Sequence, residues 1–285
     1  MAVFLDYDQD QLDAQYDNVR AVPDHARWTD RWPSDSAAVR ASLPNRLDVP
    51  YAPGPRRTLD VFPARGTGNP VMLFIHGGWW RARDKEDFTF VVPHYVAAGI
   101  AVVMVEYPLV PTVTLDQLVE CARQALIWTW QNAASFGADR ERLHVTGHSA
   151  GGHLTAMMMS TDWAARELPR DAIKSGAALS GLYDLTPIRL CYINADTRLD
   201  AAAVKRNSPI EHLPARAAPR ILAVGGKETD EFRRQQEIYA HAWHGAGLPL
   251  AIVPLPGDQH YSILDSFKGP AGPLFEAVKR QIFGA

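Results

Sequence analysis

The chain has 285 residues, of which 47% are hydrophobic and 21% charged, and a formal net charge of −3 at pH 7. This composition is ordinary for a globular protein, and the length suits one sizeable domain or two small ones. The 29 basic and 32 acidic residues are too evenly balanced for a nucleic-acid footprint or a polybasic membrane patch. We therefore expect neither a nucleic acid nor a membrane as partner.

The cysteines and the N-terminal residues indicate the compartment. Two cysteines, Cys121 and Cys191, cannot form a disulfide framework or a four-sulfur zinc site. The start of the chain, MAVFLDYDQDQLDAQYD, lacks the basic region and the apolar core of a signal peptide. No apolar run reaches the length of a transmembrane helix. We expect a cytoplasmic protein that uses no metal and no cofactor.

Residues 1–50 are rich in Asp, Arg, Trp and Pro, and we interpret them as an N-terminal cap segment. The stretch QDQLDAQYDNV predicts one helix, and SDSAAVRASL predicts a second with Ser34 or Ser36 as its N-cap. The next stretch, RTLDVFPA, alternates between apolar and polar residues, which predicts an edge strand.

Beyond this point, apolar runs alternate with helical patterns. The runs are PVMLFIHGG, GIAVVMVEY, RLHVTG, SGAALSG, PRILAVGG and LPLAIVPLPG, each suited to a parallel strand buried on both faces. One helix is expected between Thr114, its N-cap, and Gly137, and two more over DEFRRQQEIYAHAWHGAG and GPLFEAVKRQIFGA. This alternation predicts an α/β protein with a mostly parallel, doubly wound sheet and helices on both faces.

Residues 182–219 interrupt the alternation with short helices and prolines. We interpret them as a lid-like insertion that, with Trp28 and Trp32 of the cap segment, covers one end of the sheet. No repeat or low-complexity linker divides the chain, so we expect one domain over residues 1–285. A homodimer is compatible with this organisation.

Ser149 lies in GHSAGG, between the predicted strand RLHVTG and the helix that follows. Gly147 and Gly151 lack the Cβ atoms that would clash in a sharp strand-to-helix turn. Such a turn presents the hydroxyl at the carboxyl edge of the sheet, where open α/β folds bind ligands. Two interpretations remain: Ser149 is a nucleophile, or it only caps the following helix.

A nucleophilic serine needs a base, and His260 follows the last predicted strand in PLPGDQHYSIL. Among the 10 histidines it alone has this position, from which its ring can reach back to the serine. We interpret His148 as packing inside the turn, and His153 as a structural hydrogen-bonding residue at the start of the helix.

The acid that orients the histidine is expected in GGKETDEF. Glu228 is the first candidate because it comes two residues after Gly226, close behind a predicted strand. Asp230 is the alternative, although with Glu231 it suits the N-terminus of the next helix. Asp184, after the predicted strand SGAALSG, is an outside candidate.

HGGWW follows the first buried strand and offers backbone donors to an oxyanion. Glycines let the main chain approach the oxygen on which negative charge develops, and one lost donor costs about 10²–10³ in rate. We assign this function to the N–H groups of Gly78, Trp79 and Ala150, and expect His76 to brace the loop. The predicted substrate-pocket residues are Trp80, His153 and Tyr183.

These residues together resemble the α/β-hydrolase fold. HGGW, from His76 to Trp79, is similar to the oxyanion loop of the hormone-sensitive-lipase-like esterases, and GHSAGG is similar to their nucleophile elbow. The order Ser149, Glu228, His260 is similar to the serine–acid–histidine order of the fold. Four further stretches resemble the arylformamidase, or kynurenine formamidase, branch. They are HGG followed by two aromatic residues, SGLYDLTPI, EFRRQ and QYDNVRAVPD. That branch usually has aspartate where this chain has Glu228.

The resemblance covers the chain from about Thr58 to its end and implies a metal-free serine hydrolase. Its substrate would be a small ester or an N-formyl aryl amide, cleaved through an acyl-enzyme. A general short-chain carboxylesterase is the alternative within this class, and a catalytically inactive binding module is the alternative outside it. Serine at the elbow argues against a dehalogenase, which uses aspartate there.

Overall fold

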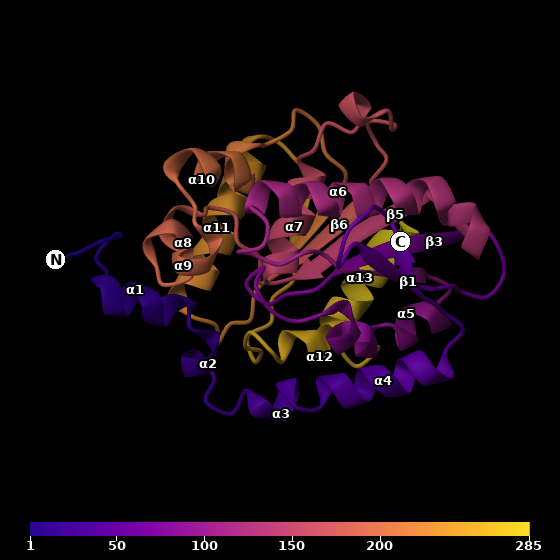
Figure 1. Ribbon diagram of the computed structural model, residues 1–285, viewed down its shortest axis with the longest axis horizontal. Coiled ribbons are helices and arrows are strands. Elements are labelled where there is room, and N and C mark those ends of the chain that lie inside the picture. Colours follow the sequence, from indigo (N-terminus) through magenta and orange to yellow (C-terminus); the bar gives the residue numbers. More distant parts are fainter. Residues whose placement is uncertain (285) are drawn as a thin grey trace.

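The computed structural model describes residues 1–284, and its centre is one eight-stranded sheet (Figure 1). The strands lie in the order β1-β2-β4-β3-β5-β6-β7-β8. They are β1 (Arg46–Pro50), β2 (Thr58–Phe62), β3 (Asn69–Ile75), β4 (Ala101–Val105), β5 (Ala138–His148), β6 (Ser175–Leu179), β7 (Arg220–Ala223) and β8 (Leu250–Ile252). The strands from β3 to β8 are parallel, while β2 is antiparallel to both β1 and β4. The prediction of a mostly parallel sheet is confirmed.

Both edges of the sheet correct the sequence-based prediction. RTLDVFPA forms β2, which is not an edge strand, because β1 pairs with its outer side. The residues of β1 are mostly exposed, and their polar sequence lacks the apolar run by which a strand is recognised. At the opposite edge, Ala251 and Ile252 of β8 are exposed, so β8 is not buried on both faces as predicted.

Helices cover both faces of the sheet, as predicted (Figure 1). One face packs against α6 (Leu115–Asn132), α7 (Ala150–Met159) and α11 (Asp230–Gly245). The other packs against α5 (Pro93–Ala97), α12 (Ile263–Phe267) and α13 (Pro273–Phe283). The insertion between β6 and β7 forms α8 (Thr186–Leu190), α9 (Asn194–Thr197) and α10 (Ala201–Asn207), and the 3₁₀ helices are η1 (Lys85–Val91), η2 (Ala133–Phe136), η3 (Ala164–Arg166) and η4 (Pro209–Glu211).

The N-terminal segment folds into four helices that lie along the outside of the domain core (Figure 1). They are α1 (Gln9–Tyr16), α2 (Asn18–Ala21), α3 (Ala26–Thr29) and α4 (Trp32–Ser42). Neither Ser34 nor Ser36 caps α4, which begins earlier than predicted. Instead the buried Ser36 hydroxyl donates to the carbonyl of Asp87 and accepts from the amide of Phe90, both at 3.0 Å. These bonds tie α4 to η1.

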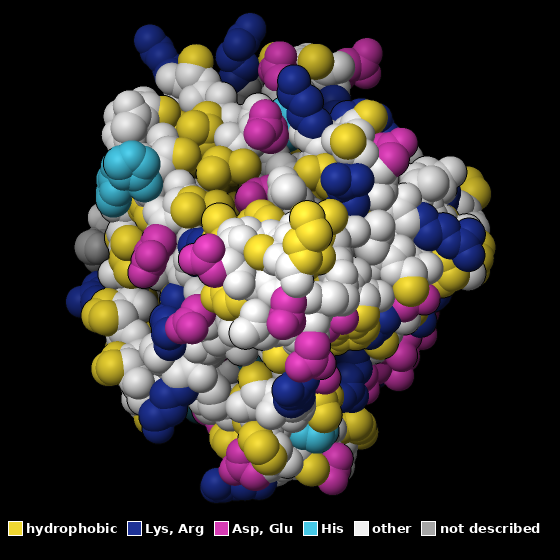
Figure 2. All heavy atoms as spheres, turned by 90° about the vertical axis from the view of Figure 1, so that its left-hand side faces the viewer, with side chains coloured by type: hydrophobic (Ala, Val, Ile, Leu, Met, Phe, Trp, Pro, Cys, Tyr) yellow, Lys and Arg dark blue, Asp and Glu magenta, His cyan; other side chains and the backbone are white. Residues whose placement is uncertain are grey.

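Within residues 1–284, no helix combines the length and the apolar character needed to cross a membrane. Figure 2 shows one face of the molecule, on which acidic and basic side chains are interspersed. No broad area of that face carries a single sign of charge.

Candidate active site

Ser149 occupies the turn between β5 and α7 in a strained backbone conformation, with φ 58° and ψ −118°. A Cβ on Gly147 would lie 2.3 Å from the carbonyl oxygen of Gly151, and one on Gly151 would lie 1.9 Å from that of Ile75. The turn therefore requires glycine at both positions. The serine hydroxyl makes no capping bond to α7, so the alternative interpretation of Ser149 as a simple N-cap is wrong.

The hydroxyl of Ser149 instead faces His260. Its Oγ lies 3.1 Å from Nε2 of His260, whose Nδ1 lies 2.7 Å from Oε2 of Glu228. All three residues are buried. Since the carboxylate can only accept, Nδ1 donates to it and Nε2 is left as the acceptor for the serine proton.

Glu228, and not Asp230 or Asp184, is the acid in contact with the imidazole. Its Oε1 accepts from the hydroxyl of Ser180 at 2.6 Å and from the amide of Gly225 at 2.8 Å. Asp230 is the exposed first residue of α11 and pairs with Arg233, while Asp184 accepts from the amide of Thr186. Ser180, whose hydroxyl fixes the carboxylate, was not predicted as a site residue from the sequence.

His148 and His153 both have buried imidazoles that donate to main-chain carbonyls. His148 Nε2 donates to the carbonyl of His260 at 2.8 Å, and the two rings lie 4.7 Å apart. Burial and the neighbouring His260 hold the pKa of His148 well below its ordinary value, so the ring is neutral. His153 Nε2 donates to the carbonyl of Asn207, and burial lowers its pKa to about 4. His153 is the predicted structural residue, while His148 does more than pack, because it holds the loop of His260.

The oxyanion loop lies directly beside the nucleophile. A Cβ on Gly77 would lie 3.1 Å from Cβ of Ser149. Gly78 has φ +114°, and a Cβ there would lie 2.1 Å from the carbonyl oxygen of Ala82, so only glycine fits. Within residues 1–284, the amides of Gly78, Trp79 and Ala150 donate to no other protein group. They are free to donate to an oxyanion.

His76 fixes this loop through both ring nitrogens. Nδ1 donates to the carbonyl of Gly77 at 2.7 Å, and Nε2 lies 3.2 Å from Oε1 of Glu106. The ring stacks on Tyr107 at 4.2 Å, and the Tyr107 hydroxyl donates to the carbonyl of His76 at 2.9 Å. Both ring nitrogens therefore face acceptor oxygens, which fixes the orientation of the ring beside the loop.

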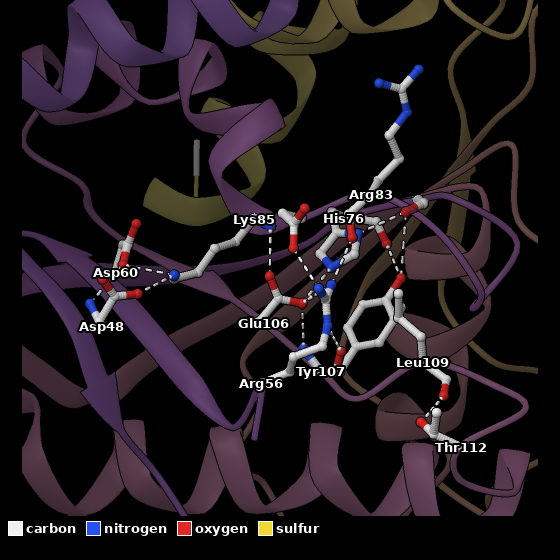
Figure 3. A network of polar contacts seen from close by, with 12 residues as sticks. Asp48, Arg56, Asp60, His76, Arg83, Lys85, Glu106, Tyr107, Leu109 and Thr112 are labelled. Atoms are coloured by element: carbon white, nitrogen blue, oxygen red, sulfur yellow. Dashed lines mark hydrogen bonds and ion pairs between the residues drawn. The ribbon is translucent and has the colours of Figure 1, made fainter. Parts of the chain in front are cut away.

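Glu106, the residue that follows β4, anchors this arrangement (Figure 3). Besides His76, it accepts from Nη2 of Arg56 at 2.8 Å and from the amides of Lys85 and Tyr107 at 3.0 and 2.9 Å. Burial raises the pKa of Glu106, but the hydrogen bond and charge of His76 and the charge of Arg56 outweigh it and hold the pKa below its ordinary value. Glu106 is therefore ionised and acts on the oxyanion loop through His76.

Replacing this anchor tests the arrangement. Glu106→Gln is expected to lower kcat for an aryl ester about 10-fold with little change in KM. The loss of a whole oxyanion donor lowers kcat about 10²–10³-fold, and this variant displaces the loop without removing a donor. Affinity for a trifluoromethyl ketone, which forms an oxyanion, should fall in parallel. The matched control is Asp48→Asn, whose carboxylate pairs with Lys85 at the far end of the network (Figure 3). A raised KM at unchanged kcat would contradict a positioning role for Glu106.

A cavity of about 250 Å³ opens above the serine. Its lining includes Asp17, Asn18, Val19, Trp32, Gly77, Gly78, Trp79, Arg81, Ala82, Arg83, Phe88, His148, Ser149, Tyr192, His260 and Tyr261. The predicted pocket residues Trp80, His153 and Tyr183 do not line it. Their side chains are buried in the core, where Trp80 meets His153 edge-on and Tyr183 stacks on Tyr239.

A larger surface cleft, of about 850 Å³, lies elsewhere. This cleft lies at the amino ends of β6 and β7. Its lining comes from residues 159–163, 170–174 and 214–218. Ligands of open α/β sheets bind at the carboxyl ends, and the cleft contains none of the three residues that meet at Ser149. We therefore place the candidate site in the smaller cavity.

Comparison with known proteins shows the family of the chain. A family profile described as BD-FAE matches residues 59–177. A kynurenine formamidase of Salmo salar is 28% identical over 286 residues, which cover 93% of each chain. A kynurenine formamidase of Drosophila melanogaster is 31% identical over 220 residues, which cover 74% of this chain and 73% of that protein. The chain belongs to the kynurenine formamidase family.

Structural similarity to known proteins extends over nearly the whole chain. A solved structure from Silicibacter sp. tm1040 has a TM-score of 0.80 and 28% identity, and the match covers 93% of this chain and 98% of that one. Carboxylesterases are also among the structural relatives. This member of the kynurenine formamidase family is a hydrolase of the arylformamidase or esterase type with the α/β-hydrolase fold. The resemblance found in the sequence is confirmed.

Proposed function

We propose that the protein is an arylformamidase that hydrolyses small N-formyl aryl amides, N-formylkynurenine among them, by serine catalysis. His260 takes the proton of Ser149 as the serine oxygen attacks the formyl carbon. The carbonyl oxygen becomes an oxyanion held by the amides of Gly78, Trp79 and Ala150. His260 then protonates the departing arylamine, and Glu228 stabilises the imidazolium.

The second half of the reaction returns the enzyme to its starting state. His260 removes a proton from water, which attacks the formyl ester on Ser149. The second tetrahedral intermediate uses the same amides, and its collapse releases formate and returns the proton to Ser149. Each proton moves through Nε2 of His260, so one base serves both steps.

One observation carries the proposal: the hydroxyl of Ser149 lies 3.1 Å from Nε2 of His260, beside main-chain amides that donate to no group of the described residues. The cavity volume of about 250 Å³ favours a small substrate. Trp32, Phe88 and Tyr192 give it aromatic walls, which favour an aromatic ring. Residues 1–50 and the insertion at 182–219 supply two of these walls and act as the lid of a single domain.

The substrate preference is tested with purified protein on N-formylkynurenine, formanilide and phenyl acetate. We expect kcat/KM for the aryl formamides to exceed that for phenyl acetate after each is divided by its uncatalysed rate. The opposite order would favour a short-chain carboxylesterase, which uses the same serine chemistry. Absence of labelling by a fluorophosphonate probe, with no turnover of any substrate, would favour an inactive binding module.

A further inference from the structure

The larger cleft, of about 850 Å³, has the size and the lining of a small-molecule site. Ligand pockets typically measure about 300–1,000 Å³ and are mostly apolar. Met159, Trp163 and Ile173 line this cleft and are buried, and Pro214, from the loop before β7, adds to the apolar lining. The indole N–H of Trp163 already donates to the carbonyl of Met158 at 3.1 Å. The inner lining therefore suits the apolar body of a ligand.

The charged residues of the cleft leave positive charge unengaged. Arg170 and Arg216 line the cleft from two different segments and are exposed. Within residues 1–284, neither guanidinium takes part in an ion pair or a hydrogen bond. Both carboxylates of the cleft have partners, because Asp171 pairs with Lys174 at 2.7 Å and Asp162 accepts from a main-chain amide at 3.1 Å. The groups left for a ligand are therefore two guanidinium forks.

A third guanidinium, that of Arg220, follows this lining in the chain. Arg220 begins β7 two residues after Ala218, so their Cα atoms lie at most about 7 Å apart. Its side chain is buried over the ring of Trp243 and donates through Nη1 to the hydroxyl of Tyr239. Among the described residues it has no carboxylate partner, and Nε and Nη2 have no hydrogen-bond partner. A buried cation without a counter-charge adds a positive potential at this end of the sheet.

We infer that the cleft is a second ligand site, which takes a small aromatic anion such as an aryl carboxylate or sulfonate. Arg170 and Arg216 offer the acidic group planar forks of donors. The sulfur of Met159 and the indole of Trp163 are favourable neighbours of an aromatic ring. A cationic ligand does not match this site, because the unengaged charges of its lining are positive. The inference does not rest on the proposed function.

The second site is separate from the catalytic one, although the same helix joins them. Ser149 precedes α7, and Met159, its last residue, lines the cleft. A helix of this length separates its two ends by about 15 Å. A covalent group on Ser149 therefore leaves the cleft open, so the two sites can be studied independently.

The test titrates two fluorescent probes into protein whose Ser149 has been treated with a fluorophosphonate. Anilinonaphthalene sulfonate is the anionic probe, and phenylnaphthylamine is its neutral counterpart with the same rings. Replacing both Arg170 and Arg216 by glutamine is expected to raise the Kd of the sulfonate about 10-fold and that of the amine less than about twofold. Each single replacement should raise the Kd of the sulfonate about threefold. The thermal midpoint of each variant checks its folding.

Two further variants locate the bound probe. Ala215→Trp adds bulk at an exposed position of the lining and should abolish the binding of both probes. Arg65→Gln is the matched control, since it removes the same charge at an exposed position between β2 and β3, outside the cleft. It should leave both Kd values within about 1.5-fold of wild type.

Three results would overturn the second site. The first is the absence of saturable binding of the sulfonate to the wild type. The second is binding of both probes to folded Ala215→Trp with wild-type Kd values, which would place them elsewhere. The third is an equal loss of sulfonate affinity in Arg65→Gln and in the double variant, which would attribute the effect to net charge alone.

Discussion

Replacing Ser149 by alanine is expected to lower kcat for formanilide on the order of 10⁴–10⁶-fold, because no other hydroxyl lies within hydrogen-bonding distance of Nε2 of His260 among the described residues. The remaining rate comes from the oxyanion amides and from substrate binding. Steady-state kinetics of purified protein and labelling by a fluorophosphonate measure the effect. The variant should bind substrate with a near-native affinity.

A matched serine variant separates this loss from a general effect on folding. Ser160 ends the same helix that Ser149 begins, and it lines the larger cleft instead of the cavity at Ser149. Ser160→Ala should retain kcat within about twofold. The backbone of Ser149 is strained with either side chain, so its replacement should leave the thermal midpoint nearly unchanged. Activity of Ser149→Ala within about 10-fold of wild type would show that another group is the nucleophile.

The nucleophile and the oxyanion loop could be predicted from the sequence because their requirements are local. Gly147 and Gly151 are needed within one turn, and Gly78 is needed by contact with a carbonyl four residues away. Each requirement falls inside a stretch of a few residues. Sequence patterns report such short-range constraints well.

The cavity could not be predicted, because its lining is assembled from distant segments. Asn18, Arg83 and Tyr261 come from three separate parts of the chain. The aromatic residues chosen instead, Trp80 and Tyr183, pack in the core, where burial of large apolar side chains stabilises the fold. An aromatic residue next to a motif is therefore weak support for a pocket.

The predictions for the two edges of the sheet were wrong for a related reason. The alternation in β2 does not mark an edge, because its polar Asp60 is buried and pairs with Lys85, and the strand lies between β1 and β4. The exposed residues of β1 and β8 need no continuous apolar run, so their patterns carry little information. Edge position depends on neighbours that one stretch of sequence does not contain.

The choice between two acids also depended on distant residues. The spacing behind β7 allowed Glu228 or Asp230, and only the fold brings the hydroxyl of Ser180 to Oε1 of Glu228. That bond, with the amide of Gly225, leaves Oε2 for His260. Glu228 therefore stands where this family usually has aspartate. Its Oε1 is held by Ser180 and Gly225, and its Oε2 contacts His260.

This geometry gives the second large prediction. Glu228→Gln is expected to lower kcat about 10³–10⁴-fold, because an amide that donates toward Nδ1 favours the wrong tautomer of His260. Glu228→Asp keeps the charge but cannot reach both Ser180 and His260, so its kcat should lie between those of Glu228→Gln and the wild type. Steady-state kinetics with formanilide, and the thermal midpoint of each variant, measure these effects.

Asp230→Asn is the control for this series, because Asp230 is exposed and, within residues 1–284, pairs only with Arg233. Its kcat should stay within about twofold of wild type. If Asp230→Asn instead lost more activity than Glu228→Gln, the acid would have to reach His260 through a rearranged loop. The order of the two losses therefore decides which carboxylate orients the base, since only one of them can occupy the position 2.7 Å from Nδ1.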